Sequence, residues 1–277
     1  MKPTNESELK FERYLGEQNL TTYDFEPDVE GKNKKIDYRL LIGDATLYLE
    51  VKEFQESPSA VINGAFDPYK RINSKIESAL QNLGDYEEHC CSIVLYNASD
   101  RYVHLSSDFL LGAMLGPICC VAPLYEHGMN LNEAIMTFGD GGYLIDHQEH
   151  RVRNCHISSV IHLEDFPIGR YLFDKEHKER SQQLQRKLSR NEVLDLIKER
   201  GNQEHNYGET VLRVVVCENP FANIPLPKNI FNGPSDERYG SDGMHIARNF
   251  TGNELNRLRY EGLYPGRSPL WEGRVNN

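Results

Sequence analysis

The sequence predicts an α/β protein with a mixed central sheet flanked by helices. Residues 36–52 alternate apolar and polar side chains on both sides of Gly43-Asp44, a pattern typical of a β-hairpin. A helical pattern from Asp67 to about Leu83 precedes the apolar run Cys91–Tyr96. That order indicates a crossover helix and then a strand buried on both faces.

The first expected element is a helix from about Glu6 to Gln18. Asn5 is suited to cap it, with Glu8 completing a capping box. Glu12 falls at helical spacing between Leu9 and Leu15, within an apolar stripe flanked by aromatic residues. Two interpretations stay open for Glu12: an edge position, or a side chain directed at a functional site, because a buried glutamate needs a partner.

The hairpin has a well-specified register. A two-residue turn at Gly43-Asp44 makes Ile42 face Ala45 and, further from the turn, Asp37 face Glu50. One face is then entirely apolar; it carries Ile36, Tyr38, Leu40, Ile42, Ala45, Leu47, Leu49 and Val51. A slip of one residue would turn the charged side chains into the core.

The other face of the hairpin carries the candidate chemistry. Directly opposed residues have β-carbons roughly 4.5–5.5 Å apart, so Asp37 and Glu50 repel each other unless a cation lies between them. Hard divalent cations such as Mg²⁺ prefer carboxylate ligands. Lys52, next on the same face, is suited to orient or deprotonate a water molecule. A solvated face with mixed charges is the alternative.

Positive and polar groups near the hairpin are candidates for substrate binding. Lys35 ends a polar loop, Arg39 lies on the charged face of the hairpin, and Lys75 and Gln81 lie on the crossover helix. Phosphate contacts are one interpretation, and solvated side chains are the other. Within the crossover helix, Asp67 is the expected N-cap with Pro68 in the first turn, and the buried stripe is Ile72, Ile76, Leu80 and Leu83.

The second half of the chain predicts two more strands around a helical insertion. Residues 101–145 mix strands and a helix. Ile157–Leu163 and Val211–Cys217 read as strands, and the charged helical pattern Asp174–Arg200 lies between them. The expected organisation is a core over 1–169, a helical insertion or lid over 170–208, and a final strand with a Pro/Gly-rich basic tail over 209–277.

Composition narrows the class of protein. The formal net charge of −11 disfavours a protein that coats nucleic acid, although it leaves room for an enzyme with a local basic patch. No apolar run is long enough to span a membrane, and the polar N-terminus lacks a secretion signal. Six cysteines in so long a chain do not form a disulfide framework. These features favour a cytoplasmic protein without a membrane partner.

Other constellations are weaker. His147, His150, Cys155 and His156 invite a zinc site but lack a second cysteine pair at ligand spacing. The glycine-rich 139–142 has no following Lys-Ser/Thr, so a turn is expected rather than a phosphate loop.

Glu12, Asp37 and the run Glu50-Val51-Lys52 together resemble the PD-(D/E)XK nuclease superfamily, which has the restriction-endonuclease-like fold. Members carry these residues on a helix and a β-hairpin, followed by a crossover helix and another strand. The resemblance covers about a third of the chain. It departs at Ile36, where the motif name has proline, and Gln81 resembles a glutamine of some subfamilies with its spacing off by one.

The resemblance implies roles for these residues. Asp37 and Glu50 would ligate Mg²⁺, or Mn²⁺ in its place, with the carbonyl of Val51 as a further ligand. Lys52 would position the attacking water, and Glu12 would complete or support the metal site. The expected function is a magnesium-dependent nuclease acting on DNA rather than RNA, in restriction, repair or anti-phage defence.

Two rival functions stay open. The first is a binding or assembly protein on the same fold, as a homodimer or with a partner subunit. The second is a hydrolase of small phosphoesters.

Overall fold

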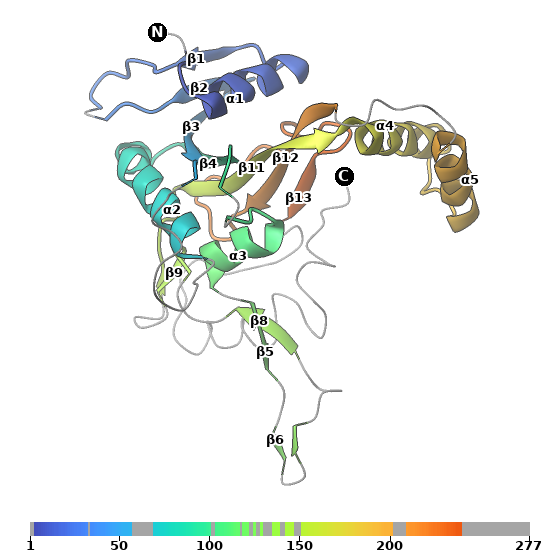
Figure 1. Ribbon diagram of the computed structural model, residues 1–277. Coiled ribbons are helices and arrows are strands. Elements are labelled where there is room, and N and C mark those ends of the chain that lie inside the picture. Colours follow the sequence, from blue (N-terminus) through green and yellow to red (C-terminus); the bar gives the residue numbers. More distant parts are fainter. Residues whose placement is uncertain are drawn as a thin grey trace.

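A seven-stranded mixed sheet forms the centre of the protein (Figure 1). The computed structural model describes residues 3–32, 34–56, 69–100, 103–116, 118–121, 124–125, 128–129, 135–138, 142–146, 151–201 and 209–239. In spatial order the strands are β1 (Tyr23–Phe25), β2 (Tyr38–Ile42), β3 (Ala45–Phe54), β4 (Cys90–Asn97), β11 (Ile157–Pro167), β12 (Thr210–Glu218) and β13 (Glu237–Tyr239). β3, β4 and β11 run parallel, whereas β2 and β12 are antiparallel to the neighbours they share with this central group. The predicted mixed α/β class is confirmed.

Helices cover both faces of the sheet. They are α1 (Glu6–Glu17), α2 (Lys70–Leu83) with the short 3₁₀ turn η2 (Gly84–Tyr86), α3 (Ser107–Leu115), α4 (Ile168–Gln183) and α5 (Arg190–Gly201). Figure 1 shows α2 and α3 on one side of the sheet and α1 on another, while α4 and α5 extend away from α2. Among the described helices, none has the length and apolar character needed to cross a membrane.

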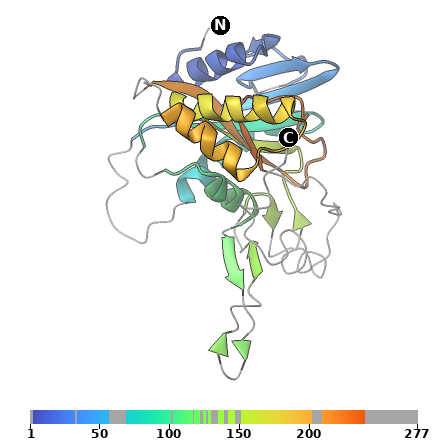
Figure 2. The ribbon, with the colours of Figure 1, turned by 90° about the vertical axis from the view of Figure 1, so that its right-hand side faces the viewer.

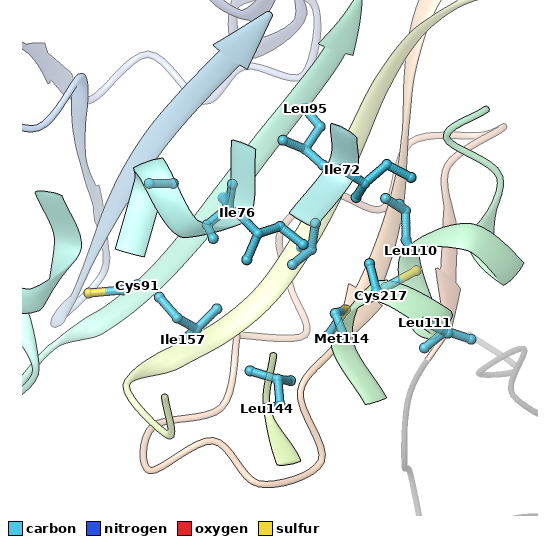
Figure 3. Packing of buried hydrophobic residues seen from close by; sticks show 14 of the residues in the cluster. Ile72, Ile76, Cys91, Leu95, Leu110, Leu111, Met114, Leu144, Ile157 and Cys217 are labelled. Carbon is cyan, nitrogen blue, oxygen red and sulfur yellow. The ribbon is translucent and has the colours of Figure 1, made fainter. Parts of the chain in front are cut away.

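The face covered by α2 and α3 has a large apolar core, which we call the α2–α3 cluster. Its members include Ile36, Tyr48, Phe54, Ile72, Ile76, Leu83, Ile93, Leu95, Leu110, Met114, Val160 and Cys217. Figure 3 shows Ile72 and Ile76 of α2 directed at the strands, with Leu110 and Met114 of α3 beside them. The predicted stripe of α2 is confirmed, with Leu80 only partly buried.

The opposite face has a second core, which we call the α1 cluster. Its members include Phe11, Tyr14, Leu15, Tyr38, Leu40, Leu47, Leu49, Val51, Val94, Ile161, Val214 and Phe231. The rings of Phe11 and Tyr38 meet edge to face at 5.2 Å. Because the aromatic residues turn inward, Leu9 is 53% exposed, and its expected place on the buried stripe is wrong. Glu8 is on the buried side of the helix instead.

The hairpin has the predicted register from the turn to Tyr38↔Leu49. The ladder ends there, so the expected strand pairs of Ile36 with Val51 and of Asp37 with Glu50 are absent from the described sheet. The side chain of Asp37 instead accepts a hydrogen bond from the Val51 N–H, at 2.6 Å. Ile36 precedes the first residue of β2, Tyr38, and is therefore not held in the strand. Its side chain packs in the α2–α3 cluster rather than beside Val51.

The sequence predicted where α1 and α2 begin from their N-cap residues. The N-cap of α1 is confirmed, since Asn5 Oδ1 accepts the Glu8 N–H at 2.8 Å. The Glu8 carboxylate accepts the Thr4 N–H and the Asn5 side-chain amide instead of the Asn5 N–H that a full capping box uses. The described part of α2 begins at Lys70, later than expected, and Asp67 and Pro68 lie outside the described residues.

The helical insertion consists of two helices, α4 and α5, joined by residues 184–189 between the antiparallel neighbours β11 and β12. In Figure 2, which is turned by 90° from Figure 1, α4 and α5 lie between the viewer and the sheet. Within 101–152 the structure describes α3 and three small ribbons. These pair β5 (Ile118–Val121) with β8 (Ile135–Phe138), β6 (Leu124–Tyr125) with β7 (Gly128–Met129), and β9 (Ile145–Asp146) with β10 (Arg151–Val152). Of the tail expected after the final strand, residues 219–239 are described and add the edge strand β13 to the sheet, and the basic residues from Arg248 onward lie outside the described residues.

Candidate functional site

Strand β3 carries a buried carboxylate toward helix α2. Successive side chains of a strand alternate between faces, so Glu50 and Lys52 share the α2 side with Tyr48 and Phe54. Glu50 is 1% exposed. One of its oxygens, Oε1, accepts hydrogen bonds from Lys52 Nζ at 2.5 Å and from Asn82 Nδ2 of α2 at 2.6 Å.

The second carboxylate oxygen of Glu50, Oε2, is buried and has no such hydrogen bonds among the described residues. A buried carboxylate oxygen without a donor is unfavourable by about 1–3 kcal/mol or more. An oxygen in this position is suited to accept a cation or a water molecule.

Asp37 lies beside this carboxylate, at the entry to β2. The pKa of Asp37 is raised to about 7, chiefly by burial and by the negative charge of Glu50, with a smaller contribution from the charge of Glu8. The hydrogen bond from the Val51 N–H and the positive charge of Lys52 act in the opposite direction. The carboxyl groups of Asp37 and Glu50 therefore interact electrostatically, although the two residues are not paired in the β2–β3 ladder, which ends at Tyr38 and Leu49.

The helix residue expected to support this site is directed elsewhere. Glu12 is half-buried and hydrogen-bonds to Tyr23, whose pKa rises through burial and through the charge of Glu12. One turn earlier, Glu8 is the α1 carboxylate whose charge acts on Asp37. Glu8 also accepts hydrogen bonds from the N–H of Thr4 and the side chain of Asn5, at 3.2 and 2.5 Å.

Positive charge gathers along the same side of α2. Burial, followed by the charges of Lys52 and Arg71, lowers the pKa of Lys75. Lys75 Nζ also lies 5.8 Å from the centre of the Phe54 ring. Arg71 forms an ion pair with the buried Asp100. Lys75, expected to bind substrate, is thus close to the Glu50–Lys52 pair.

The other three substrate-binding candidates do not converge there. Lys35 is exposed, and Arg39 is bonded to Asp24 Oδ2 of β1 through two nitrogens at 2.6 and 2.9 Å. Gln81 is exposed, and its carbonyl accepts a bond from Lys34 Nζ. The α2 side chain that reaches Glu50 is the next residue, Asn82.

Helical spacing in the sequence could have identified Asn82 as a residue of the site. Lys75 and Asn82 are seven residues apart, which is about two helical turns, so they share one side of α2. Asn82 also directly precedes the buried Leu83. Polar residues at this spacing beside a buried stripe indicate side chains that approach the sheet.

Metal sites built from three or more ligands are not evident in the described part of the chain, where no His, Cys, Asp or Glu side chains cluster in such a number. Of the zinc candidates, Cys155 and His156 are described, and His147 and His150 lie outside the described residues. Cys90, Cys91 and Cys217 are buried thiols.

Comparisons with known proteins were made at three levels. No protein-family model, no curated protein and no solved structure matches this chain.

Proposed function

We propose that this protein is a magnesium-dependent nuclease that hydrolyses phosphodiester bonds in DNA, built on a restriction-endonuclease-like core. The observation that carries the proposal is the interaction of Asp37 with the buried Glu50, which also accepts a hydrogen bond from the ammonium group of Lys52. Two carboxylates and a lysine on one side of a hairpin suit hydrolysis of a phosphodiester.

The residues present fit a divalent metal ion. The buried Glu50 Oε2 has no donor in the described structure, and burial together with the like charge of Glu50 raises the pKa of Asp37. Both features favour a hard cation, which would neutralise the pair and coordinate carboxylate oxygen. Asp37 and Glu50 would hold Mg²⁺, with the Val51 carbonyl as a further candidate ligand. When bound, the ion supplies Lewis-acid activation of the phosphoryl group and of a water molecule.

The surrounding side chains would prepare the substrate. Asn82 holds Glu50 Oε1 in one orientation through a 2.6 Å bond. Lys52 lies at the same oxygen and would orient the attacking water and stabilise negative charge on the phosphoryl oxygens. Lys75 adds a positive charge beside it, which favours an approaching phosphate.

The order of the elements also supports the proposal. A helix that carries acidic residues, α1, comes first, and the hairpin β2–β3 follows. The crossover helix α2 then leads to the parallel strand β4. This is the arrangement that the resemblance implied. The proposal includes a cytoplasmic role in restriction, repair or anti-phage defence.

Cleavage of plasmid DNA by purified, folded protein tests the proposal. Lys52→Ala and Glu50→Gln are each expected to remove Mg²⁺-dependent cleavage. Arg13→Ala is the matched control, because it removes one positive charge from the exposed side of α1 where Arg13 contacts Glu17. If Lys52→Ala cleaves like the unsubstituted protein, the lysine has no part in the reaction and the proposed mechanism fails.

One observation favours a second candidate function, a binding or assembly protein on the same fold. The large apolar side chains of Leu184, Leu194 and Ile197 on the α4–α5 insertion are 47, 43 and 50% exposed. Exposed apolar residues that gather on one element mark surfaces for protein partners. Calorimetry separates the candidates: Mg²⁺ binding that disappears in Glu50→Gln supports the nuclease, and its absence in the unsubstituted protein supports the assembly role.

A further inference from the structure

The helical hairpin of α4, residues 184–189 and α5 differs in charge from the rest of the chain. Residues 168–201 contain nine lysines and arginines against six aspartates and glutamates, a net charge of +3 in a chain of net charge −11. Within α4, all of which the structure describes, no residue is buried. Most residues of α4 are half-buried, whereas most of residues 182–191 are exposed, so the sequence near the turn is constrained only in part by the core.

Positive charge is concentrated at the tip of this hairpin. Residues 182–190 include Arg186, Lys187 and Arg190 and contain no acidic residue. Lys187 and Arg190 are exposed. The tip therefore presents positive charge to solvent at the end of the hairpin.

The tip is also held in one conformation. Glu192 accepts two bonds from the Arg186 guanidinium, at 2.8 and 2.9 Å. It also accepts the N–H and the hydroxyl of Ser189, at 2.7 and 2.6 Å. These contacts, first the bond from Arg186, hold the pKa of Glu192 well below its usual range. A pre-ordered basic tip loses less conformational entropy when it binds an anionic partner.

We infer that this tip, which we call the basic tip (residues 182–190), binds the phosphate backbone of nucleic acid at a distance from Glu50. Figure 1 places α4 and α5 on the side of the molecule away from α2, which carries Lys75 and Asn82. A ligand that contacts both regions has to be long and negatively charged. Duplex DNA meets both conditions, with one charge per roughly 1.7 Å of its axis. The inference rests on the proposed function, since it assigns the basic tip to the substrate of that site.

Salt-dependent binding tests this inference. The full-length protein carries Glu50→Gln to prevent cleavage, and its binding to a labelled DNA duplex is followed by fluorescence anisotropy over a range of KCl concentrations without divalent metal. Lys187→Ala combined with Arg190→Ala is expected to weaken binding. It is also expected to reduce the slope of log K against log salt by about 1.8, because each lost phosphate contact removes about 0.9.

The matched control removes the same charge from the same hairpin. Lys175 is exposed on α4, and Lys198 lies on α5 with Asp195 as its partner. Lys175→Ala combined with Lys198→Ala is expected to leave the slope unchanged. Circular dichroism of both double variants checks that the helices persist.

Several outcomes would overturn the inference. Equal slopes for the tip and control variants would show that the basic tip makes no phosphate contact, and the same follows if the duplex does not bind at all. A change in oligomeric state confined to the tip variant would assign the basic tip to a protein interface. Cleavage by the unsubstituted chain with an unchanged tip slope refutes this inference alone. A reduced slope without any Mg²⁺-dependent cleavage refutes the proposed activity alone.

Discussion

Replacing Asp37 by asparagine should make the protein more stable at alkaline pH and should flatten its pH dependence. Burial and the charge of Glu50 raise the pKa of Asp37 from 3.8 to about 7. The folded state thus holds this proton more tightly than the unfolded chain does. Its contribution to stability is fully present below pH 3.8 and is lost as the pH rises through about 7.

The magnitude follows from the difference between the two pKa values. Each pKa unit corresponds to about 1.36 kcal/mol, so ionisation of Asp37 opposes folding by up to about 4 kcal/mol above pH 7. Asparagine removes the charge but keeps an oxygen that accepts the Val51 N–H, which Asp37 binds at 2.6 Å. The free energy of unfolding of Asp37→Asn, relative to the unsubstituted protein, should therefore increase with pH.

Urea denaturation between pH 4.5 and 8.5 measures this difference. Asp195→Asn is the control, because Asp195 is exposed on α5 and its side chain is 64% accessible. Excess Mg²⁺ at pH 8 should stabilise the unsubstituted protein and not Asp37→Asn, since a ligand stabilises only the state that binds it. A stability difference that is constant across this pH range would refute the raised pKa of Asp37 in the folded protein.

Three further predictions concern the supports of the site and the core. Asn82→Ala removes a donor to Glu50 and should lower the free energy of unfolding by about 1–3 kcal/mol in urea denaturation; no change would mean that the bond is absent in solution. Ile76→Ala should lower it by about 2–5 kcal/mol through a cavity beneath α2, and a loss below 1 kcal/mol would argue against the packing of that helix. Tyr14→Phe removes the 2.6 Å bond to Asp236, whose pKa is raised by burial, and should destabilise by about 1.5–3 kcal/mol near neutral pH; thermal unfolding with an unchanged midpoint would contradict this.

The local features of the hairpin and of α2 were predictable from the sequence. A two-residue turn fixes which residues of β2 and β3 face each other, and alternation along a strand fixes the face of each side chain. Glu50 and Lys52 were assigned in this way to one face of β3, where the structure has them bonded. The buried positions of α2 likewise follow from helical periodicity, since Ile72 and Ile76 recur after one turn.

The partners of the site were decided by tertiary structure. Glu8 rather than Glu12 acts on Asp37, because the aromatic side of α1 packs on the sheet and rotates the helix. Asn82 rather than Gln81 reaches Glu50, because α2 presents that side to β3.

The end of a strand also depended on its surroundings. The alternation of residue types continues through Asp37, but the ladder stops at Tyr38, and Asp37 uses its side chain to bind the backbone of β3. The physical reason is the range of each interaction. Turn type, strand alternation and helical period are set by the covalent backbone within a few residues. The rotation of a helix and the length of a strand are set by how side chains remote in sequence fill the space between the layers.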